Sequence, residues 1–302
     1  GNEYSLLISD TTGAVPGSSG SRERLAFVYR WSVVRRARIV SDVTYDRNYV
    51  INTILENMDE LLEAKADYEH EMARYESGDR STEPNIKMPC FFSFIRQPFM
   101  AAFQIMGHPG TEPYEFMAIN AHLHYGDFVS DRRMEFEALM DWIRERVTDR
   151  ARVYYPNFML LGDLNLDYDN PGSDRTRMED RLKSLNNDAG EAVHVNFPFL
   201  DVHPSQTEVY RTNSRRTETF DQIGLFFRDQ RWPRFDQNSQ MGVDPSGPDY
   251  GVFNFCELFA QALYGEPFAD LASSSQSAII RRFEYSVSDH LPLWLRLPLP
   301  TT

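Results

Sequence analysis

The stretch NFMLLGDLN, residues 157–165, joins the apolar run 158–161 to Gly162, Asp163 and Asn165. A short run of bulky apolar residues that ends at a glycine is typical of a buried β-strand. Asp163 and Asn165 are two positions apart, so in extended chain their side chains lie on one face. A carboxylate beside a carboxamide can accept a proton from water and bind a phosphoryl oxygen. An Asx turn explains the same residues equally well, so this stretch alone leaves both roles open.

Strand-like and helical segments alternate on both sides of this stretch. Strand character is found at 4–9, 25–29, 99–105, 115–123 and 291–297, and helical spacing at 48–75, 134–147 and 175–185. This pattern predicts an α/β or α+β layered sandwich, and no linker divides the chain, so we expect one domain over residues 1–302. Residues 11–20 and 229–250 have the composition of loops. The segment 48–83 reads as a helical insertion whose polar half is a solvated face or a partner-binding arm.

Composition excludes several classes of protein. The chain has 302 residues, of which 41% are hydrophobic and 25% charged, and a net charge of −14. A protein that binds nucleic acid by broad neutralisation of phosphates is usually basic, although a small pocket holding a metal ion still acts on one phosphate. Cys90 and Cys256 are too few for a disulfide framework or a zinc cluster. No apolar run approaches the ~18 residues of a membrane span, and no signal peptide is visible. The compartment stays undetermined.

A second polar strand end is NAHLH, residues 120–124. Asn120 and His122 share one face of the strand, and His124 joins them if the strand continues. A lone histidine is more often structural than functional. Asn-x-His-x-His at the end of a strand is harder to assign to packing alone.

Two further strand ends carry an acid or an imidazole. Asp221 stands at the start of a strand in TFDQI, residues 219–223, and SDHLP, residues 288–292, precedes the final strand. A functional imidazole needs a carboxylate that fixes its tautomer and raises its basicity. Asp221 is the candidate partner of His290 if the two strand ends adjoin. Four strand ends with such side chains predict a real site.

The order and wording of these motifs resemble the endonuclease/exonuclease/phosphatase superfamily, which has a deoxyribonuclease I-like fold. The resemblance is carried by NAHL (120–123), GDLN (162–165), FDQI (220–223) and SDHLP (288–292). RERLAFVYR (22–30) is similar to the strand of secreted deoxyribonucleases that carries a glutamate, and FIRQP (94–98) to their substrate-side arginine segment. The similarity runs from about Tyr4 to Leu297, interrupted by the helical insertion.

The resemblance implies a fold, a reaction and a set of residues. The fold is a four-layer sandwich of two packed mixed β-sheets flanked by helices. The reaction is in-line attack of water on a phosphodiester or phosphomonoester, with Mg²⁺, or Mn²⁺ in its place, and nucleic acid among the candidate substrates. The implied catalytic residues are Glu23, His122, Asp163, Asn165, Asp221 and His290, with Arg96 and Asn120 binding substrate and Asp289 supporting the metal.

Each of these residues has an implied role. Asp163 is the general base or water-orienting group, and Asn165 holds the phosphoryl group. His290 donates to phosphoryl oxygens and is oriented by Asp221. His122 does the same with Glu23 as its partner.

Two elements of the superfamily pattern are missing. An asparagine on the first strand and a metal-binding glutamate in a later Gln-Glu both precede the segment that matches Tyr4 onward. We therefore expect a chain truncated at its N-terminus. The missing metal-binding glutamate also supports an alternative hypothesis, that the chain is a non-catalytic binding module with this fold. A dinuclear metallophosphoesterase using His122, His124 and Asp163 is a third reading, disfavoured because its His-x-His should come late in the chain. The substrate, the role of the insertion and the oligomeric state stay open.

Overall fold

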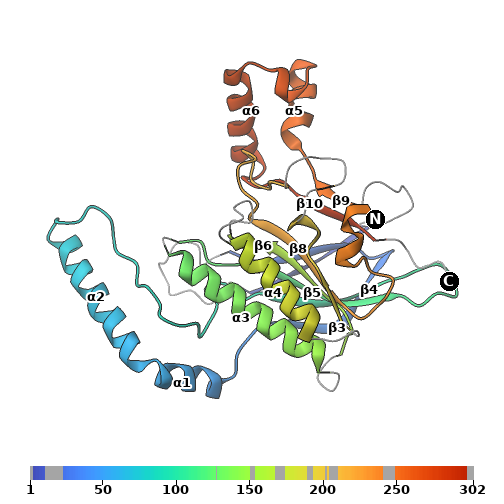
Figure 1. Ribbon diagram of the computed structural model, residues 1–302. Coiled ribbons are helices and arrows are strands. Elements are labelled where there is room, and N and C mark those ends of the chain that lie inside the picture. The colour runs from blue at the N-terminus through green and yellow to red at the C-terminus, as the bar shows by residue number, and fades with distance from the viewer. Residues whose placement is uncertain are drawn as a thin grey trace.

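A computed structural model describes residues 3–10, 23–126, 128–149, 154–166, 174–188, 193–200, 203, 210–240 and 249–297 (Figure 1). Its strands are β1 (Tyr4–Ile8), β2 (Ala26–Arg30), β3 (Val34–Asp42), β4 (Phe99–Ile105), β5 (Tyr114–His122), β6 (Phe158–Asp163), β7 (His194–Asn196), β8 (Asp221–Phe227), β9 (Asp249–Val252) and β10 (Leu293–Arg296). Its α-helices are α1 (Arg47–Glu56), α2 (Met58–Glu76), α3 (Val129–Thr148), α4 (Asp174–Asp188), α5 (Phe255–Tyr264) and α6 (Ser273–Ser286). Short 3₁₀ helices occur at Pro198–Leu200, Phe235–Gln240 and Phe268–Asp270.

A six-stranded mixed sheet forms the centre of the fold, in the order β3-β4-β5-β6-β8-β7. β5 and β6 are parallel, because α3 carries the chain from the end of one strand back to the start of the next, and the other neighbours are antiparallel. The polar ends of β5 and β6 therefore meet the start of β8 at one edge of the sheet. This arrangement places the motifs side by side.

Both faces of the sheet are buried. On one face α3 and α4 pack on a core that includes Ile119, Leu160 and Phe226. On the other face lie two antiparallel ladders, β1–β2 and β9–β10, over a second core that includes Phe116 and Leu225. Burial on two sides explains why β6 and β8 read as nearly continuous apolar runs.

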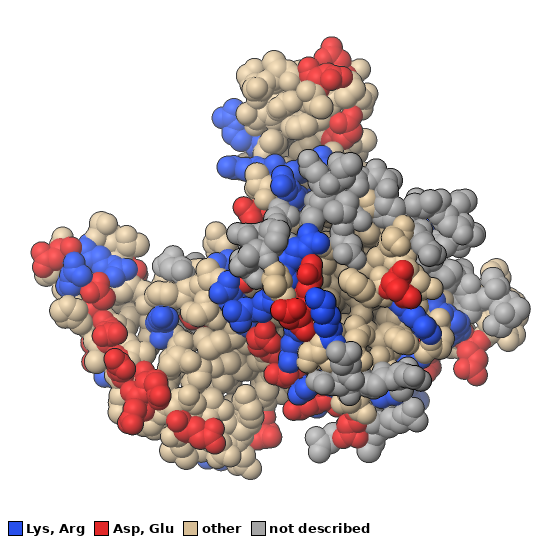
Figure 2. Space-filling view, in the orientation of Figure 1, with Lys and Arg blue, Asp and Glu red and all other residues tan. Residues whose placement is uncertain are grey.

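Two helical pairs extend away from the sheet (Figure 1). α1 and α2 have no buried residue, and the acidic side chains of α2 are visible along it in Figure 2. α5 and α6 enclose a small core of their own, around Cys256, Ala260 and Ile279. None of the helices in the described part of the chain is both long enough and apolar enough to cross a bilayer.

The α/β class and the mixed sheet confirm the expected fold class. The helical insertion is present as α1 and α2. The second layer differs in detail, since among the described residues it consists of two separate two-stranded ladders. β3, α5 and α6 were not expected from the sequence. Residues 229–250, expected to be a loop, contain a 3₁₀ helix and the start of β9, and the expected loop at 11–20 lies outside the described residues.

Gly162 is required where β6 passes β5. Its φ is +149°, and a Cβ at this position would lie 1.8 Å from the carbonyl oxygen of Ala121. We expect Gly162→Ala to lower the free energy of unfolding by about 3 kcal/mol or more, because backbone must move to admit the methyl group. Gly265, with φ +71° and no atom within 4 Å of an added Cβ, is the matched control. Gly265→Ala should cost only about 1 kcal/mol in the same urea titration. Equal losses would show that steric contact with β5 is not the cause.

Candidate active site

Strand register aligns three of the expected site residues in one row. His122 pairs with Asp163 across β5 and β6, and Asp163 pairs with Asp221 across β6 and β8. Leu161 and Ile223, two positions away on the same strands, face the core beneath the two ladders. Because side chains alternate along a strand, Asp163 and Asp221 face the same side. Asp163 and Asp221 therefore form a polar edge on the same face of the sheet whose other residues pack on the core beneath the two ladders.

The end of β6 is closed by a turn that also presents the acid. The backbone N–H of Asn165 donates to Asp163 Oδ1 at 2.9 Å, and Asn165 has a φ of +52°, a conformation that asparagine tolerates. The Asn165 side chain is 3% exposed and donates to the carbonyl of Leu123 at 3.0 Å. The structural and the catalytic interpretation of this motif are therefore compatible. Oδ1 of Asp163 closes an Asx turn, while Oδ2 can accept a proton from water.

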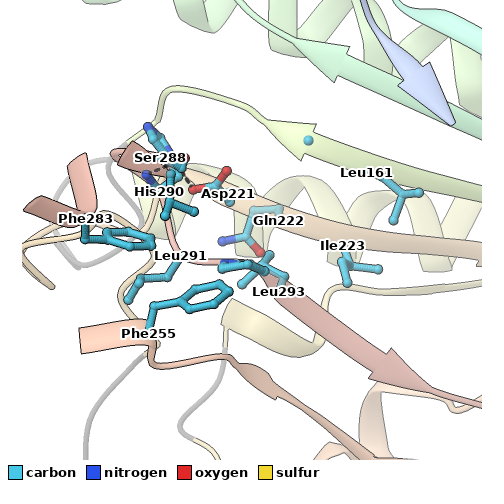
Figure 3. Close-up of a pocket in the computed structure, with 13 residues that line it drawn as sticks. Leu161, Asp221, Gln222, Ile223, Phe255, Phe283, Ser288, His290, Leu291 and Leu293 are labelled. Carbon is cyan, nitrogen blue, oxygen red and sulfur yellow. Dashed lines mark hydrogen bonds and ion pairs between the residues drawn. The ribbon is translucent and has the colours of Figure 1, made fainter. Parts of the chain in front are cut away.

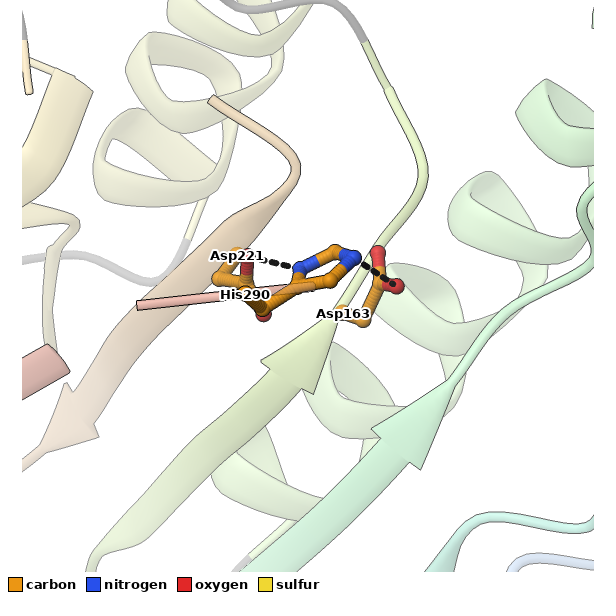
Figure 4. A group of neighbouring side chains, drawn as sticks. All are labelled: Asp163, Asp221 and His290. Atoms are coloured by element: carbon orange, nitrogen blue, oxygen red, sulfur yellow. Dashed lines mark hydrogen bonds and ion pairs between the residues drawn. The ribbon is translucent and has the colours of Figure 1, made fainter. Parts of the chain in front are cut away.

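Asp221 and His290 form a close pair in the site (Figure 4). His290 Nδ1 lies 2.6 Å from Asp221 Oδ2. Thr212, which is fully buried, donates its hydroxyl to the same oxygen at 2.6 Å, and its carbonyl accepts from Leu291 N at 2.6 Å. Thr212 thus holds the start of β8 against the segment that carries His290. The expected pairing of these two strand ends is present.

His122 is paired with a different carboxylate, that of Glu23. Its Nδ1 lies 2.8 Å from Glu23 Oε2, and Arg96 Nε lies 2.9 Å from the same oxygen. Arg96 also donates to the carbonyl of Leu123 at 3.2 Å, and its side chain is 11% exposed. Arg96 therefore orients Glu23 as well as facing the cavity, a role that its assignment as a substrate-binding residue did not include.

The two imidazoles flank one carboxylate oxygen. Nε2 of His122 and Nε2 of His290 each lie 3.7 Å from Asp163 Oδ2. These three groups open on a cavity of about 560 Å³. The cavity is also lined by Glu23, Arg96, Tyr125, Asn165, Asn213, Ser214, Arg215, Phe220, Glu284 and Asp289. It is large enough for a phosphate ester with part of its substituents.

Burial and charge move the pKa values of these groups in different directions. Burial, with Asp221 nearby, raises the pKa of Asp163 to about 6. The hydrogen bond that His290 donates to Asp221 raises the pKa of His290 to about 9. Burial, with Arg96 nearby, lowers the pKa of His122. At neutral pH His290 is therefore a cation that carries a proton on both ring nitrogens, whereas His122 is neutral. Since Nδ1 of His122 faces Glu23, its Nε2 carries the lone pair.

An apolar cavity lies behind the His290–Asp221 pair (Figure 3). It has a volume of about 420 Å³, and its wall includes Phe255, Phe283 and Leu291. Phe283 and Leu291 are buried, and the rings of Phe255 and Phe283 stack at 5.4 Å. Asp221 and His290 themselves line this cavity, so one side of the pair faces a largely apolar wall.

The donor set fits a hard divalent cation. Candidate ligand atoms of Asp163, Asp221 and His290 lie within 4.8 Å of one another, and the carboxylates are the donors among them because cationic His290 has no free lone pair. Asp221 Oδ2 is already engaged by two hydrogen bonds, so Asp163 Oδ2 is the more available oxygen of this group. Asp289 is exposed and lines the same cavity. Carboxylate oxygens with water completing the shell are what Mg²⁺ and Mn²⁺ prefer.

Two residues named from the sequence lie away from the cavity wall. Asn120 is on the expected face of β5, but its side chain donates to the carbonyl of Ala26 at 3.1 Å and so links the sheet to β2. β5 ends at His122, so His124 does not continue the row, and its ring lies over Gly126. Neither Asn120 nor His124 is among the described residues that line the cavity.

Sequence reasoning missed two buried residues that bind segments of the site: Thr212, and Glu135, whose carboxylate accepts the backbone N–H groups of Ile95 and His124. The sequence around Thr212 contains no motif that indicates a role in the site, because this role depends on contacts with distant segments. Glu135 did leave a signal. It stands four positions before Leu139 on the buried stripe of α3, where a charged side chain needs a partner.

Comparisons with known proteins give one partial sequence match and several structural similarities. No protein-family model matches the chain. A deoxyribonuclease from Thioalkalivibrio sp. (strain K90mix) is 38% identical over 76 residues, which are 24% of this chain and 19% of that protein. The match thus spans about a fifth of that relative's length.

Solved structures give similarities at low sequence identity. One is an endonuclease/exonuclease/phosphatase from Bacteroides vulgatus, with a TM-score of 0.42, 14% identity, and coverage of 99% of this chain and 77% of that one. Another is a conserved protein of unknown function from Enterococcus faecalis V583, with a TM-score of 0.44, 12% identity, and coverage of 98% and 77%. A third is a mannosyl-6-phosphatase from Bacteroides thetaiotaomicron, with a TM-score of 0.41, 11% identity, and coverage of 98% and 77%. One of these solved structures is named as a member of the endonuclease/exonuclease/phosphatase superfamily, which the motifs of this chain resemble.

Proposed function

We propose that this chain is a divalent-metal-dependent phosphoesterase that hydrolyses its substrate by in-line attack of water on phosphorus. The observation that carries the proposal is the placement of Asp163 Oδ2 at 3.7 Å from two imidazoles, each oriented by its own carboxylate. Structural ion pairs seldom need two imidazoles aimed at one acid. A site that moves a proton and stabilises a developing anion does need them.

Opposite pKa directions suggest how the groups divide the work. Asp163, ionised above about pH 6, accepts the proton of the attacking water, and the neutral Nε2 of His122 is a second acceptor beside it. Cationic His290 donates to a phosphoryl oxygen, where negative charge grows in the transition state. Asp289 would support the divalent ion, directly or through water, which leaves Asp163 Oδ2 to accept the proton, and the ion would supply further positive charge at the phosphoryl oxygens. The leaving oxygen takes a proton from solvent or from His290.

The proposed substrate is a nucleic-acid phosphodiester. The deoxyribonuclease similarity and the Glu23–Arg96 pair favour a diester, and Arg96 and Arg215 line the cavity despite the net charge of −14. Basic side chains also gather at the foot of the α5–α6 pair in Figure 2, where α6 carries the exposed Arg281 and Arg282. Such local positive charge suits a strand of phosphates that passes the site.

Hydrolysis assays test the reaction directly. Bis-p-nitrophenyl phosphate and plasmid DNA are incubated with the chain in EDTA, and then with Mg²⁺ or Mn²⁺. We expect turnover only with metal, and nicking of the plasmid at lower enzyme concentration than is needed for the small diester.

Two variants decide between an enzyme and a binding module. Asp163→Asn should lose about 10³- to 10⁴-fold in kcat, whereas Asp236→Asn, an exposed substitution in the 3₁₀ helix Phe235–Gln240, should match the unaltered chain. Turnover in EDTA, or equal turnover in Asp163→Asn, contradicts the proposal. If the chain binds DNA without metal and hydrolyses nothing, the alternative hypothesis of a non-catalytic binding module is favoured over the enzyme.

A further inference from the structure

A buried carboxylate on α3 joins two segments of the candidate active site. Glu135 is 4% exposed. Its Oε1 accepts the backbone N–H of Ile95 at 2.7 Å, and its Oε2 accepts the backbone N–H of His124 at 2.6 Å. The two amides belong to segments that are far apart in sequence, and each oxygen of the carboxylate serves one of them.

Both segments carry groups that act in the cavity. Ile95 immediately precedes Arg96, and His124 immediately follows Leu123. The carbonyl of Leu123 accepts from Arg96 at 3.2 Å and from the Asn165 side chain at 3.0 Å. Glu135 therefore fixes the position from which Arg96 reaches Glu23, and also the carbonyl that anchors Asn165.

Packing alone does not account for an acid at this position. Leu139 and Ile143, which continue the stripe of Glu135 at intervals of four residues, are fully buried apolar residues. Burial raises the pKa of Glu135 to about 7, which shows that its charged form is costly there. Only a carboxylate offers two acceptor oxygens to two N–H donors, because a glutamine would turn its own N–H₂ toward one of them.

We propose that Glu135 is a positioning residue of the candidate active site, and that it sets the Arg96 segment and the turn after β5 in the geometry that catalysis requires. This inference rests on the proposed function. Glu135 does not line the cavity and acts through Arg96 and Asn165. Its contribution is to keep Arg96 on Glu23, and so Glu23 on His122, during the reaction.

The test compares Glu135→Gln with Glu137→Gln on the same helix. Glu137 faces Arg181 on α4, away from the site, and is the matched control. We expect kcat of Glu135→Gln to fall about 10- to 100-fold, with a smaller change in KM, since removing partners that orient an active site has this size of effect. Glu137→Gln should keep its kcat. Amide hydrogen exchange at Ile95 and His124 should accelerate only in Glu135→Gln.

Two further variants separate positioning from a merely structural role. Glu135→Asp keeps both acceptor oxygens, so it should recover part of the kcat and of the amide protection, and it replaces Glu135→Gln if that chain does not fold. In an Arg96→Gln background, Glu135→Gln should cost much less than in the unaltered chain, because both changes break one pathway.

The outcomes are distinguishable from a failure of the proposed function. If the amides of Ile95 and His124 exchange faster while kcat equals that of Glu137→Gln, the positioning role is overturned and the activity stands. Equal kcat in Glu135→Asp and Glu135→Gln, or full additivity with Arg96→Gln, also overturns it. If the unaltered chain hydrolyses nothing with Mg²⁺ or Mn²⁺, the proposed function fails, whatever the amides report.

Discussion

Asp163→Asn is expected to lower kcat for phosphodiester hydrolysis by about 10³- to 10⁴-fold, which is the upper part of the range for loss of a general base. The substitution is nearly isosteric. The Asn side-chain oxygen can still accept from Asn165 N, so the turn at the end of β6 is retained. What is lost is the oxygen that lies between His122 and His290 and can take a proton from water.

The pH profile gives this prediction a second readout. With the pKa of Asp163 at about 6, log kcat/KM of the unaltered chain should rise through that pH as the carboxylate loses its proton. The residual activity of Asp163→Asn should lack this acid limb. Asp236→Asn serves as the control and should reproduce both the rate and the limb. If Asp163→Asn retains more than a tenth of the activity, Asp163 is not the proton acceptor.

The sequence was sufficient for the local parts of the site. Glycine after a buried strand, and polar residues at alternate positions, predicted where Asp163 and Asn165 stand because these rules depend only on neighbours along the chain. Pairing across the sheet could also be anticipated for Asp221 and His290. The structure confirms a mixed α/β sheet and brings Glu23, His122, Asp163 and His290 together around one cavity.

Contacts between distant segments could not be read in this way. Thr212 is a threonine in an irregular segment, and only the packing of that segment against β8 brings its hydroxyl onto Asp221. Asn120 has the right face, yet the approach of β2 engages its side chain. Glu135 differs from both, because an acid on a buried helical stripe is visible in the sequence once the stripe is drawn.

The division of the second layer into two ladders has the same origin. β1 pairs with β2, and β9 with β10, through local registers that their sequences support. Whether such ladders join into one sheet depends on strand edges and on the packing of both over the core below, and neither is encoded within a single strand. In the described residues the ladders share that core without pairing to each other.

Asp221→Asn is expected to move the alkaline limb of the pH profile down by about 2.5 pH units, from about 9 toward 6.5. The hydrogen bond that His290 donates to Asp221 holds the pKa of His290 at about 9, so activity that needs the imidazolium should fall only above that pH. Asparagine removes the negative charge and returns the His290 pKa toward its ordinary value of 6.5. At pH 8 the cationic fraction would then drop about 30-fold, and kcat with it.

NMR titration of the His290 ring in EDTA measures the same pKa without reference to activity. The unaltered chain should titrate near pH 9 and Asp221→Asn near pH 6.5. His290→Gln should lose about 10²- to 10³-fold in kcat, as expected when one positioned donor to a phosphoryl oxygen is removed, and its remaining activity should show no alkaline limb. If the ring titrates near pH 9 in both chains, the charge on His290 does not come from Asp221. If the ring shifts but the rate profile does not, His290 is not the group that donates to the phosphoryl oxygen, and the stabilising charge must come from elsewhere in the cavity.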